Sequence, residues 1–426
     1  MKAVLTNRIY MTADMLLQNK LEEELTYIFP RFNPTNPPEV FKNIAMVRSS
    51  IVSIPVGRLD LIPENYLIVD KRTEVPVEFP EFNGTLRASQ KAIYDQVDSS
   101  CIINAKPAWG KTFSGLAIAA KLGQKTLVAV HTVPLRNQWA REVKKVFGIE
   151  PGIIGSGMFE TDSPIVIGNV QALYRKSDEI KKMFGTIIMD EVHHVSAPTF
   201  SRIIDVSYAK YKIGLSATLQ RKDGKHIMFS DYFGKKVFTA KKENSMTAEI
   251  HIIKSQVRFP DGARTPWAIR INQLMNDQMY RNTVCATAMT YAHMGHKVLV
   301  VADRVNFLKA CQELVGDQSV VVVGETDNRE REIAKLSEKP YNILFGTQSI
   351  FSEGINQTHL SCLILATPIN NNPLLEQLIG RIERMMEGKR TPVVIDYHLV
   401  GNTARRQASQ RMNFYIQQGY KIKQVA

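Results

Sequence analysis

The chain has 426 residues, of which 44% are hydrophobic and 22% are charged, a composition typical of globular proteins with more than one domain. Its formal net charge of +13 favours an anionic partner, most commonly nucleic acid. There is no apolar run of membrane-spanning length, no secretory signal and no C-x-x-C pair. The sequence therefore predicts no membrane association, no structural metal and no disulfides, and it favours a cytoplasmic protein.

Residues 1–84 differ in charge from the rest of the chain. They carry 9 basic and 11 acidic side chains, whereas residues 85–240 carry 22 and 13, and residues 241–426 carry 23 and 17. Helical spacing over residues 12–25 precedes a proline-rich stretch and strand-like runs at 45–56 and 65–69. This pattern predicts a small α+β accessory domain over residues 1–84, with DNA binding as one candidate role.

From residue 85 onward, short apolar runs alternate with helical stretches in two successive series. This alternation predicts parallel sheets covered by helices on both faces. We therefore expect an α/β protein with two tandem doubly wound parallel-sheet domains, residues 85–240 and 241–426, joined by a Lys-rich linker at residues 235–245. Strands are expected at residues 101–105, 126–130, 165–167, 186–189 and 212–215, and then at 297–301, 319–323, 342–345, 362–366 and 392–395.

Residues 104–112 have the sequence NAKPAWGKT and lie between an apolar run and a helix-like stretch. This is the arrangement of a phosphate-binding loop, although Ala105 stands where the full pattern has glycine. Backbone N–H groups at the helix N-terminus would point at the anion. We expect Lys111 to bind the β- and γ-phosphates and the Thr112 hydroxyl to join the Mg²⁺ coordination shell. The other nucleotide contacts expected in this loop are Pro107, Ala108, Trp109 and Gly110.

Two carboxylates, Asp190 and Glu191, come directly after the apolar run at residues 186–189. In a doubly wound sheet, ligands bind at the carboxyl ends of the strands. Asp190 is therefore expected to hold Mg²⁺, directly or through water, and Glu191 to orient and deprotonate the water that attacks the γ-phosphate. The pattern predicts ATP and Mg²⁺ as cofactors.

Several ordered motifs resemble those of superfamily 2 helicases, and most closely the group that contains XPB and the phage UvsW-type branch-migration helicases. The resemblance covers about residues 85–400. It implies two RecA-like domains, a DExH-type ATPase motor and, for a viral protein, a place in the host cytoplasm. The motifs are Lys111-Thr112, Asp190-Glu191-Val192-His193, Ser216-Ala217-Thr218, the stretch GLSATLQRKDG at residues 214–224, and QLIGRIER at residues 377–384.

The resemblance also implies roles for individual residues of the first motor domain. Gln90 would hydrogen-bond the adenine edge, and Arg87 would support it. His193, Ser216 and Thr218 would couple hydrolysis to domain movement.

In the second motor domain, Gly354 and Asn356 lie in a motif that faces the nucleotide in the related helicases. Arg381 and Arg384 would stabilise the charge that develops on the γ-phosphate, and Gln377 would assist. The two arginines are about one turn apart and are expected on one helix face. The contacts implied with the nucleic-acid strand are His131, Thr132, Gln138, Asn169, Gln171, Gly346 and Thr347.

Two further features lie outside these motifs. Residues 259–267 combine turn residues, an arginine and Trp267, which would either wedge a DNA strand or pack in the fold. The stretch after Asp396 is basic with interspersed aromatics, which fits either a DNA contact or a helix packed on the second domain.

We therefore interpret the chain as an ATP-dependent DNA helicase or translocase that unwinds or branch-migrates forked or branched DNA with little sequence preference. The alternatives are the same motor acting on RNA, a duplex DNA translocase that does not separate strands, and a nucleic-acid-binding protein with an inactive motor fold. The DExH form and the Arg-Lys-Asp-Gly extension at residues 221–224 look more like the DNA-acting members.

Overall fold

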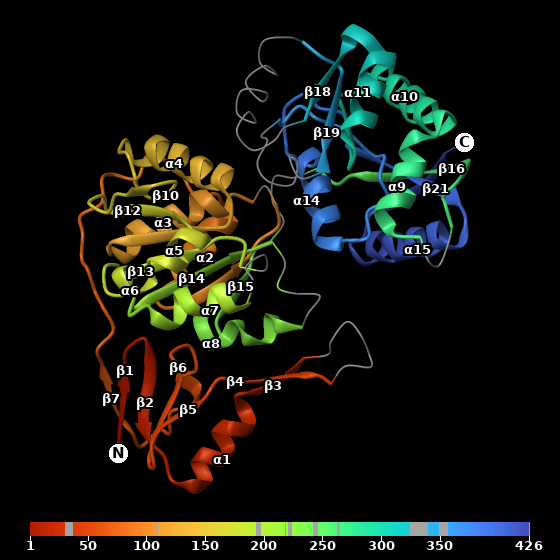
Figure 1. Ribbon diagram of the computed structural model, residues 1–426. Coiled ribbons are helices and arrows are strands. Elements are labelled where there is room, and N and C mark those ends of the chain that lie inside the picture. Colours follow the sequence, from red (N-terminus) through yellow and green to blue (C-terminus); the bar gives the residue numbers. More distant parts are fainter. Residues whose placement is uncertain are drawn as a thin grey trace. The chain divides into compact units, whose positions relative to one another are not determined.

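The structure is a computed structural model of the chain. It describes residues 1–29, 37–107, 109–192, 197–217, 219, 224–241, 246–261, 265–323, 340–348 and 357–425. These residues form two compact units, Met1–Lys241 and Lys242–Ala426 (Figure 1). None of the helices among them is long and apolar enough to cross a membrane.

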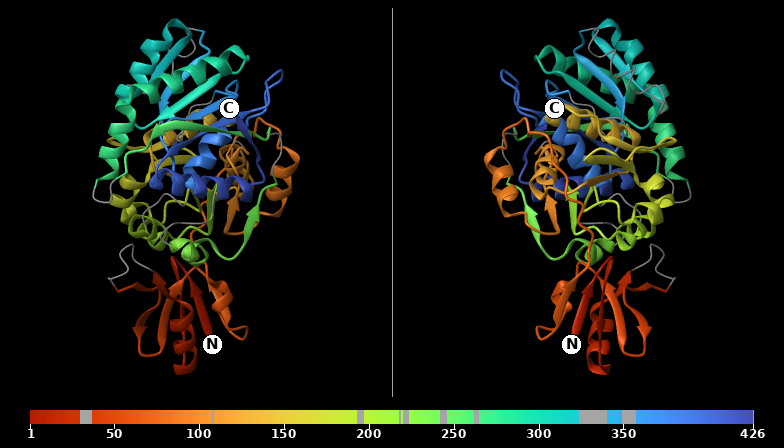
Figure 2. Two further views of the ribbon diagram at one scale, coloured as in Figure 1. Left: turned by 90° about the vertical axis from the view of Figure 1, so that its right-hand side faces the viewer. Right: turned by 90° about the vertical axis from the view of Figure 1, so that its left-hand side faces the viewer.

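The first unit begins with a small sheet and one helix, α1 (Met15–Glu24), which Figure 2 shows in red. The Asp14 carboxylate accepts the Leu17 N–H at 2.8 Å and so caps this helix. The predicted helix and the strands predicted at 45–56 and 65–69 are confirmed. The strands are β1 (Lys2–Leu5), β2 (Arg8–Thr12), β5 (Ala45–Arg48), β6 (Ile51–Pro55) and β7 (Leu67–Asp70), in the order β5-β6-β2-β1-β7, with β3 (Thr26–Phe29) and β4 (Glu39–Lys42) in a separate two-stranded sheet.

The rest of the first unit is one large sheet with helices on both faces (Figure 1). Its strands are β8 (Cys101–Asn104), β9 (Thr126–Val130), β10 (Gly152–Gly155), β11 (Met158–Phe159), β12 (Ile165–Asn169), β13 (Thr186–Met189), β14 (Tyr211–Ser216) and β15 (Val237–Thr239). Its helices are α2 (Ala88–Gln96), α3 (Lys111–Leu122), α4 (Val133–Phe147), α5 (Val170–Arg175), α6 (Ser177–Ile180), α7 (Ala197–Val206) and α8 (Phe229–Phe233).

The strand order in this sheet is β11-β10-β12-β9-β13-β14-β8-β15. Every neighbouring pair is parallel except β10 with β11. All five residues of β9 are buried, as expected for a parallel strand between two helical layers. The carboxyl ends of β9, β12, β13, β14 and β8 consequently lie along one edge of the sheet, and the segments that follow them are the place where a ligand site is expected.

Buried polar contacts fasten the N-terminal sheet to the rest of the first unit. The fully buried Asp231 carboxylate accepts hydrogen bonds from Tyr27 Oη and Asn43 Nδ2, both at 2.8 Å. A guanidinium nitrogen of Arg58 lies 3.5 Å from the same carboxylate. Tyr27 also packs in one hydrophobic cluster with Phe233 of α8. The N-terminal sheet is therefore held rigidly against the large sheet.

The second unit contains a seven-stranded sheet that is entirely parallel. Its strands are β16 (Glu249–Arg258), β17 (Val298–Ala302), β18 (Ser319–Val322), β19 (Ile343–Thr347), β20 (Cys362–Leu365), β21 (Val393–Val400) and β22 (Lys421–Val425), in the order β18-β19-β17-β20-β21-β16-β22. Its helices are α9 (Trp267–Asn276), α10 (Gln278–His293), α11 (Val305–Val315), α14 (Asn372–Ile382) and α15 (Asn402–Gln417). Three 3₁₀ turns complete the described chain, at Leu59–Leu61, Lys225–Met228 and Gly316–Gln318.

The structure bears on two further expectations from the sequence. The predicted linker at residues 235–245 begins with β15, which pairs with β8 and belongs to the first sheet. The basic stretch after Asp396 is part of the second fold, because the Arg411 guanidinium makes hydrogen bonds of 2.8 and 2.6 Å to the Asp396 carboxylate. In the same stretch β22 extends the sheet beside β16. The packed-helix alternative is therefore confirmed for the side of α15 that carries Arg411, and a nucleic-acid contact by its exposed side, which carries Arg405 and Arg406, stays a prediction.

Replacing Asp231 with alanine is expected to destabilise the first unit by about 3–5 kcal/mol, because Tyr27 and Asn43 lose their buried hydrogen-bond acceptor and Arg58 loses one of its carboxylates. Urea denaturation followed by circular dichroism measures the loss. Asp98→Ala is the matched control, because Asp98 pairs with Lys236 at the surface, where ion pairs contribute little. Equal shifts for the two variants would show that Asp231 does not fasten the N-terminal sheet.

Candidate active site

The loop between β8 and α3 is fixed at both of its ends. At the first end, the Ala105 N–H donates to the Ser216 carbonyl of β14 at 2.9 Å. At the second end, Gly110 has φ 91° and forms the N-cap of α3, a left-handed conformation that glycine adopts without strain. Between them, the buried Trp109 indole donates to Ser89 Oγ at 2.8 Å. Ala108, predicted to contact nucleotide, lies outside the described residues.

Arg87 and Gln90, the predicted adenine contacts, lie against the back of this loop. Gln90 Nε2 donates to the Trp109 carbonyl at 2.8 Å, and the Arg87 guanidinium donates to the same oxygen. Gln90 Oε1 accepts the Arg87 backbone N–H at 2.9 Å. An added Cβ at Gly110 would lie 2.6 Å from Gln90 Nε2, so the Gln90 side chain would have to move away from the Trp109 carbonyl. The structure therefore ties the two predicted adenine contacts to the phosphate-loop backbone.

Lys111, Asp190 and Glu191 come together at the carboxyl edge of the sheet. Lys111 Nζ lies 3.1 Å from Glu191 Oε1 and donates to the Ala105 carbonyl at 3.2 Å. Glu191 has φ 50°, a conformation that a residue with a side chain adopts at a cost. The turn after β13 thus directs the Glu191 carboxylate back to the first residue of α3. Pro107 lies in the loop before α3, and Thr112 lies in the first turn of α3, directly after Lys111.

The Asp190 carboxylate is buried and held by two donors. Trp139 Nε1 donates to its Oδ2 at 2.7 Å, and the Glu191 backbone N–H donates to its Oδ1 at 2.9 Å. Burial raises the pKa of the Asp190 carboxyl to about 6, and the Glu191 charge adds to this effect, whereas Lys111 and the Trp139 N–H oppose it. The sequence analysis missed Trp139 as a partner of Asp190, because only the order β9-β13 brings α4 over this carboxylate.

The predicted strand contacts of the first unit follow two neighbouring strands. Asn169 ends β12 and pairs in register with Val130, the last residue of β9. His131 and Thr132 come next along the chain, and the Thr132 hydroxyl accepts the Leu135 N–H at 3.4 Å as the N-cap of α4. The structure therefore places the predicted contacts from both segments at one edge, with Gln138 on α4 and Gln171 on α5.

Arg136 is a residue of this edge that sequence reasoning missed. Its guanidinium donates to Asn169 Oδ1 at 3.2 Å and to Ser156 Oγ at 3.1 Å, and the side chain is buried. Asn169 is itself buried, so its amide oxygen holds Arg136 in this structure. The signal for Arg136 in the sequence is its spacing from Trp139 and Val143 on the buried face of α4.

Ser216, one of the predicted coupling residues, is fully buried at the end of β14. His193 and Thr218, the other two, lie outside the described residues. In the second unit, Gly354 and Asn356 also lie outside them. Gly346 and Thr347 end β19 at the carboxyl edge of the second sheet.

Gln377 and Arg381 lie on α14, but this helix ends at Ile382 and Glu383 is its C-cap. Arg384 therefore lies beyond the helix, and the expectation that both arginines share one helical face is wrong. Burial lowers the pKa of the Arg384 guanidinium. The preceding Glu383 is buried and its Oε1 accepts the Ala248 N–H at 3.0 Å, so this turn is anchored to the start of β16.

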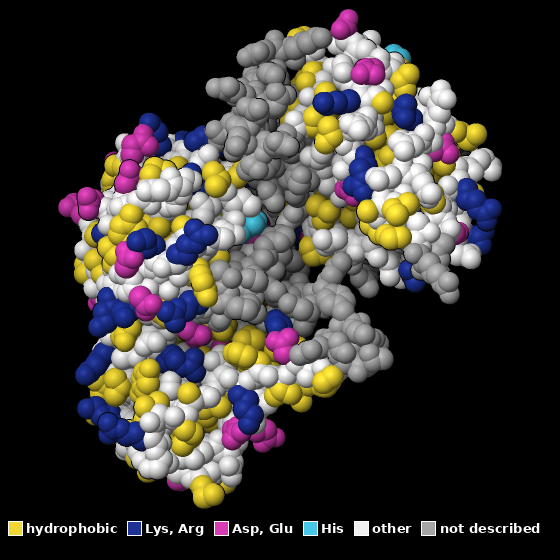
Figure 3. Space-filling view, in the orientation of Figure 1, with side chains coloured by type: hydrophobic (Ala, Val, Ile, Leu, Met, Phe, Trp, Pro, Cys, Tyr) yellow, Lys and Arg dark blue, Asp and Glu magenta, His cyan; other side chains and the backbone are white. Residues whose placement is uncertain are grey.

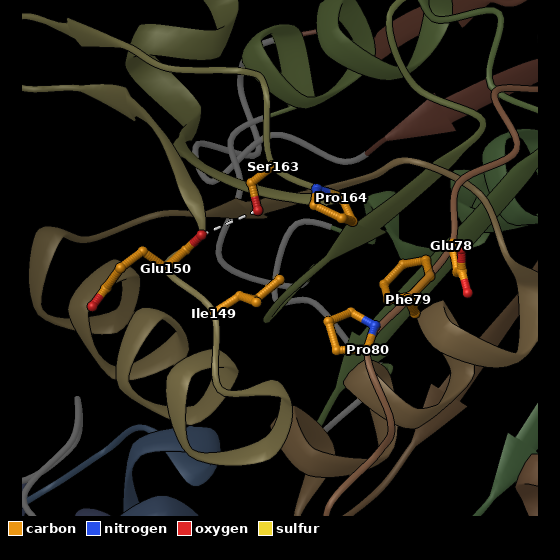
Figure 4. A pocket seen from close by; sticks show the side chains of 7 residues that line it. All are labelled: Glu78, Phe79, Pro80, Ile149, Glu150, Ser163 and Pro164. Carbon is orange, nitrogen blue, oxygen red and sulfur yellow. Dashed lines mark hydrogen bonds between the residues drawn. The ribbon is translucent and has the colours of Figure 1, made fainter.

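A hollow of about 510 Å³ also lies on the first unit (Figure 4). Ser163 Oγ donates to the Glu150 carbonyl at 3.1 Å at its rim, as the dashed line shows. Pro164, which lines it, precedes β12, so the hollow is at the amino edge of the sheet, opposite the carboxylates. Its lining residues are Glu78, Phe79, Pro80, Ile149, Glu150, Ser163 and Pro164. Among the described residues, no group of three or more His, Cys, Asp or Glu side chains is placed to hold a metal ion.

Comparison with known families agrees with this geometry. The family described as type III restriction enzyme, res subunit, matches residues 83–221, and the helicase conserved C-terminal domain matches residues 281–386. In structure, the chain is similar to Saccharomyces cerevisiae Dbp5 bound to RNA and ADP BeF3, with a TM-score of 0.57 and 12% identity over 79% of this chain and 89% of that one. This likeness supports tandem RecA-like domains.

Three viral relatives are similar in sequence. A probable helicase of Escherichia phage T5 is 42% identical over 99% of this chain and 95% of its own length. A protein of Acanthamoeba polyphaga mimivirus, whose name includes the words ATP-dependent RNA helicase, is 28% identical over 82% of this chain and 71% of its own length. The ATP-dependent DNA helicase uvsW of Enterobacteria phage T4 is 26% identical over 64% of this chain and 59% of its own length.

The fold and the paired domain matches define an ATP-hydrolysing nucleic-acid helicase with RecA-like domains. The chain belongs to superfamily 2 and to its UvsW-like phage type.

Replacing Gly110 with alanine is expected to lower ATP hydrolysis at least tenfold, because the new Cβ would lie 2.6 Å from Gln90 Nε2 and 3.2 Å from an Arg87 nitrogen. Gly148→Ala is the matched control, since Gly148 also has a positive φ (70°) but nothing lies within 4 Å of its Cβ position. Both variants share a backbone cost of about 1–2 kcal/mol. Steady-state ATPase assays and thermal melting measure both effects, and equal activity in the two variants would contradict the crowding behind the loop.

Proposed function

We propose that this protein is an ATP-dependent DNA helicase or translocase that acts on forked or branched DNA. The observation that carries this proposal is the meeting of Lys111 with two carboxylates at the carboxyl edge of the first sheet: Lys111 Nζ lies 3.1 Å from Glu191 Oε1, and the Glu191 backbone N–H donates to the Asp190 carboxylate. A protein that only bound nucleic acid would need no paired carboxylates beside a phosphate-loop lysine. Similarity to the phage T4 DNA helicase supports DNA as the substrate.

In this proposal the loop at residues 107–112 holds the triphosphate. The first N–H groups of α3 have no intrahelical acceptor and point toward an anion bound at Gly110. Lys111 exchanges its contact with Glu191 for the β- and γ-phosphates, since phosphate oxygens carry more negative charge. Arg87 and Gln90 hold the Trp109 carbonyl behind the loop and read the adenine edge.

The residues at the edge also fit Mg²⁺. The ion prefers oxygen ligands, and the candidates are the Asp190 carboxylate and the hydroxyl of Thr112, which follows Lys111 in the first turn of α3. When bound, Mg²⁺ would neutralise charge on the phosphates. The hydrogen bonds from the Trp139 indole and the Glu191 N–H fix the orientation of the Asp190 carboxylate.

Glu191 is the proposed general base. Its carboxylate is released when Lys111 turns to the phosphates, and it then accepts the proton of the attacking water. In the second unit we propose that Arg381 and Arg384, assisted by Gln377, contribute positive charge to the γ-phosphate as it is hydrolysed. Gly354 and Asn356 are proposed nucleotide contacts, and His193, Ser216 and Thr218 are proposed to couple hydrolysis to movement.

Residues at the carboxyl edges of the two sheets would bind the nucleic-acid strand. We propose His131, Thr132, Gln138, Asn169 and Gln171 for the first unit, and Gly346 and Thr347 for the second. We keep the boundaries 1–84, 85–240 and 241–426 as the proposed accessory, first motor and second motor domains. An RNA substrate is the second candidate, because the mimivirus relative carries an RNA helicase name. A duplex translocase is the third.

The experiment that tests the proposal compares ATP hydrolysis with single-stranded DNA, duplex DNA, forked DNA, a four-way junction and RNA, at one stated salt concentration. Strongest stimulation by fork or junction supports the proposal. Strongest stimulation by RNA would replace it with the RNA helicase. Strong stimulation by plain duplex, without strand product in a parallel unwinding assay, would replace it with the translocase.

Lys111→Ala is expected to abolish ATP hydrolysis, and Glu191→Gln is expected to bind ATP but turn it over at least a hundredfold more slowly. The reason is that the first change removes the phosphate contact and the second removes the base. Nucleotide-binding and single-turnover assays separate the two effects. Lys121→Ala on the exposed side of α3 is the control, and normal turnover in Lys111→Ala would exclude the phosphate-loop assignment.

Trp139→Phe is expected to move the acidic limb of the pH profile of kcat/KM to higher pH by about one unit. The Trp139 N–H lowers the pKa of Asp190, so its loss raises a pKa that is already about 6. Below that pKa Asp190 is protonated and cannot hold a cation, so activity falls as the pH falls through it.

Phe147→Leu is the matched control, because Phe147 is buried on the same helix. This substitution loosens the core but removes no hydrogen bond to Asp190. It should lower stability and leave the pH limb in place. A limb that moves equally in both variants would show that the indole acts through packing alone.

A further inference from the structure

Trp267, at the start of α9 in the second unit, is 40% exposed, whereas Trp109 and Trp139 are only 4% and 0% exposed. Its ring packs on the fully buried Phe259 with centroids 5.4 Å apart and planes inclined by 33°. Phe259 thus supports the indole from the core while part of Trp267 faces solvent. An exposed and rigidly supported indole is unusual, because a tryptophan gains most from complete burial of its large surface.

Hydrogen bonds fix the segments that carry this indole. Arg270, one turn along α9, donates through Nε to the Thr265 carbonyl at 2.8 Å and through a terminal nitrogen to Thr403 Oγ1 at 3.4 Å. The Asp261 carboxylate accepts the backbone N–H groups of Asn402 at 3.0 Å and Thr403 at 3.2 Å. The segment before α9 and the first turn of α15 are therefore tied together, and Trp267 stands on a fixed base.

Two arginines lie at the start of α9, Arg270 one turn beyond Trp267 and Arg304 against the Ala268 carbonyl. Arg304 donates to the Ala268 carbonyl at 3.4 Å and to Asn272 Oδ1 at 2.5 Å, so its guanidinium lies against the start of α9. Two carboxylates are near, but Asp261 is engaged as the cap of α15 and Asp303 is partly buried beside Arg304. Figure 3 shows yellow hydrophobic side chains over α9 with dark blue basic side chains nearby. The arginines of this part of the fold are Arg258 at the end of β16, Arg270, Arg304, and the exposed Arg405 and Arg406 on α15.

Trp267 and the arginines around it lie at the same edge of the second sheet as the predicted nucleic-acid contacts of that unit. Thr347 at the end of β19 pairs in register with Ala302 at the end of β17, and Arg304 follows Ala302 by two residues. Arg258 and Val400 pair at the ends of β16 and β21. All these strands are parallel, so Trp267 lies on the carboxyl edge of the second sheet, on the side of β16 and β21.

We propose that Trp267 is a stacking platform for one unpaired base of the bound nucleic-acid strand, with the arginines around it holding the flanking phosphates. An indole face accepts any base, so the platform would grip a strand without reading its sequence. The positive surround supplies the phosphate contacts that a single aromatic ring lacks. The proposal rests on the nucleic-acid binding shared by this family and does not depend on the choice between DNA and RNA.

The first test uses the intrinsic fluorescence of the protein without nucleotide, because Trp109 lies in the phosphate loop and would respond to ATP. The probe is an oligo(dT) of about twelve nucleotides, long enough to fill a typical single-strand site. In the wild type, saturating oligo(dT) is expected to quench the acrylamide-accessible emission, which comes from Trp267. Trp267→Phe is expected to lose this signal while binding oligo(dT) within about threefold of the wild type, because phenylalanine still stacks.

Trp267→Ala is expected to weaken oligo(dT) binding by about 5- to 150-fold, the range for loss of one stacked base. Blunt duplex binding, which offers no unpaired base, should change far less. Ile416→Ala, which also removes an exposed apolar side chain from the second unit, should leave both affinities unchanged. Arg405→Gln should reduce the slope of log affinity against log salt by about 0.7.

Three results would overturn the proposal. One is wild-type emission that stays unchanged at saturating oligo(dT), which decides the matter even if Trp267→Ala does not fold. Another is wild-type affinity for oligo(dT) in a folded Trp267→Ala protein. The third is an equal loss for oligo(dT) and blunt duplex, which would mean that the base does not stack. A protein that binds neither DNA nor an oligo(rU) of the same length would instead overturn the proposed function itself.

Discussion

The burial of one carboxylate, Asp190, is the constraint on which the first unit depends. Removing this group from water makes ionisation costly, and the Trp139 N–H, the Glu191 N–H and the Lys111 charge offset that cost only in part. The three partners come from α4, from the turn after β13 and from α3. Only the strand order β9-β13-β14-β8 brings these elements to one edge. The geometry of this site therefore depends on the topology of the sheet, and the Lys111–Glu191 ion pair closes the cluster on its other side.

The N-terminal sheet is held by the same kind of contact. Asp231 is buried beneath it and takes its partners from three separate segments of residues 1–84. Arg8 of β2 lies 3.3 Å from Asp205 on α7, and burial lowers the pKa of the neighbouring Lys212 to about 7. A shift of the N-terminal sheet would break these contacts, and a buried charge that loses its partner is costly. These buried contacts consequently hold residues 1–84 against the large sheet of the first unit.

The sequence predicts those parts of the fold that depend on local pattern. Buried strands such as β9 and β13 are continuous apolar runs, and the phosphate loop and the Asp190–Glu191 pair each lie within a few residues of such a run. Polar side chains such as Lys254, Lys421 and Lys423 interrupt strands β16 and β22, and their strand state comes from pairing across the fold, with each other and, for β16, also with β21. The contacts of Trp139 with Asp190 and of Arg136 with Asn169 also form across the fold. No local pattern in the sequence predicts which loop a helix side chain will contact.

Helix α4 contacts both the proposed nucleic-acid contacts and the Asp190 carboxylate at the edge of the first sheet. Its N-cap is Thr132, a proposed strand contact, and its next turns carry Arg136, which holds Asn169, and Trp139, which holds Asp190. Arg136 and Trp139 lie one turn apart on α4, so the proposed strand contacts Thr132 and Asn169 share one helix with the indole that donates to Asp190. In the proposed function, strand binding and hydrolysis would then be linked through α4, because its Trp139 N–H donates to the Asp190 carboxylate.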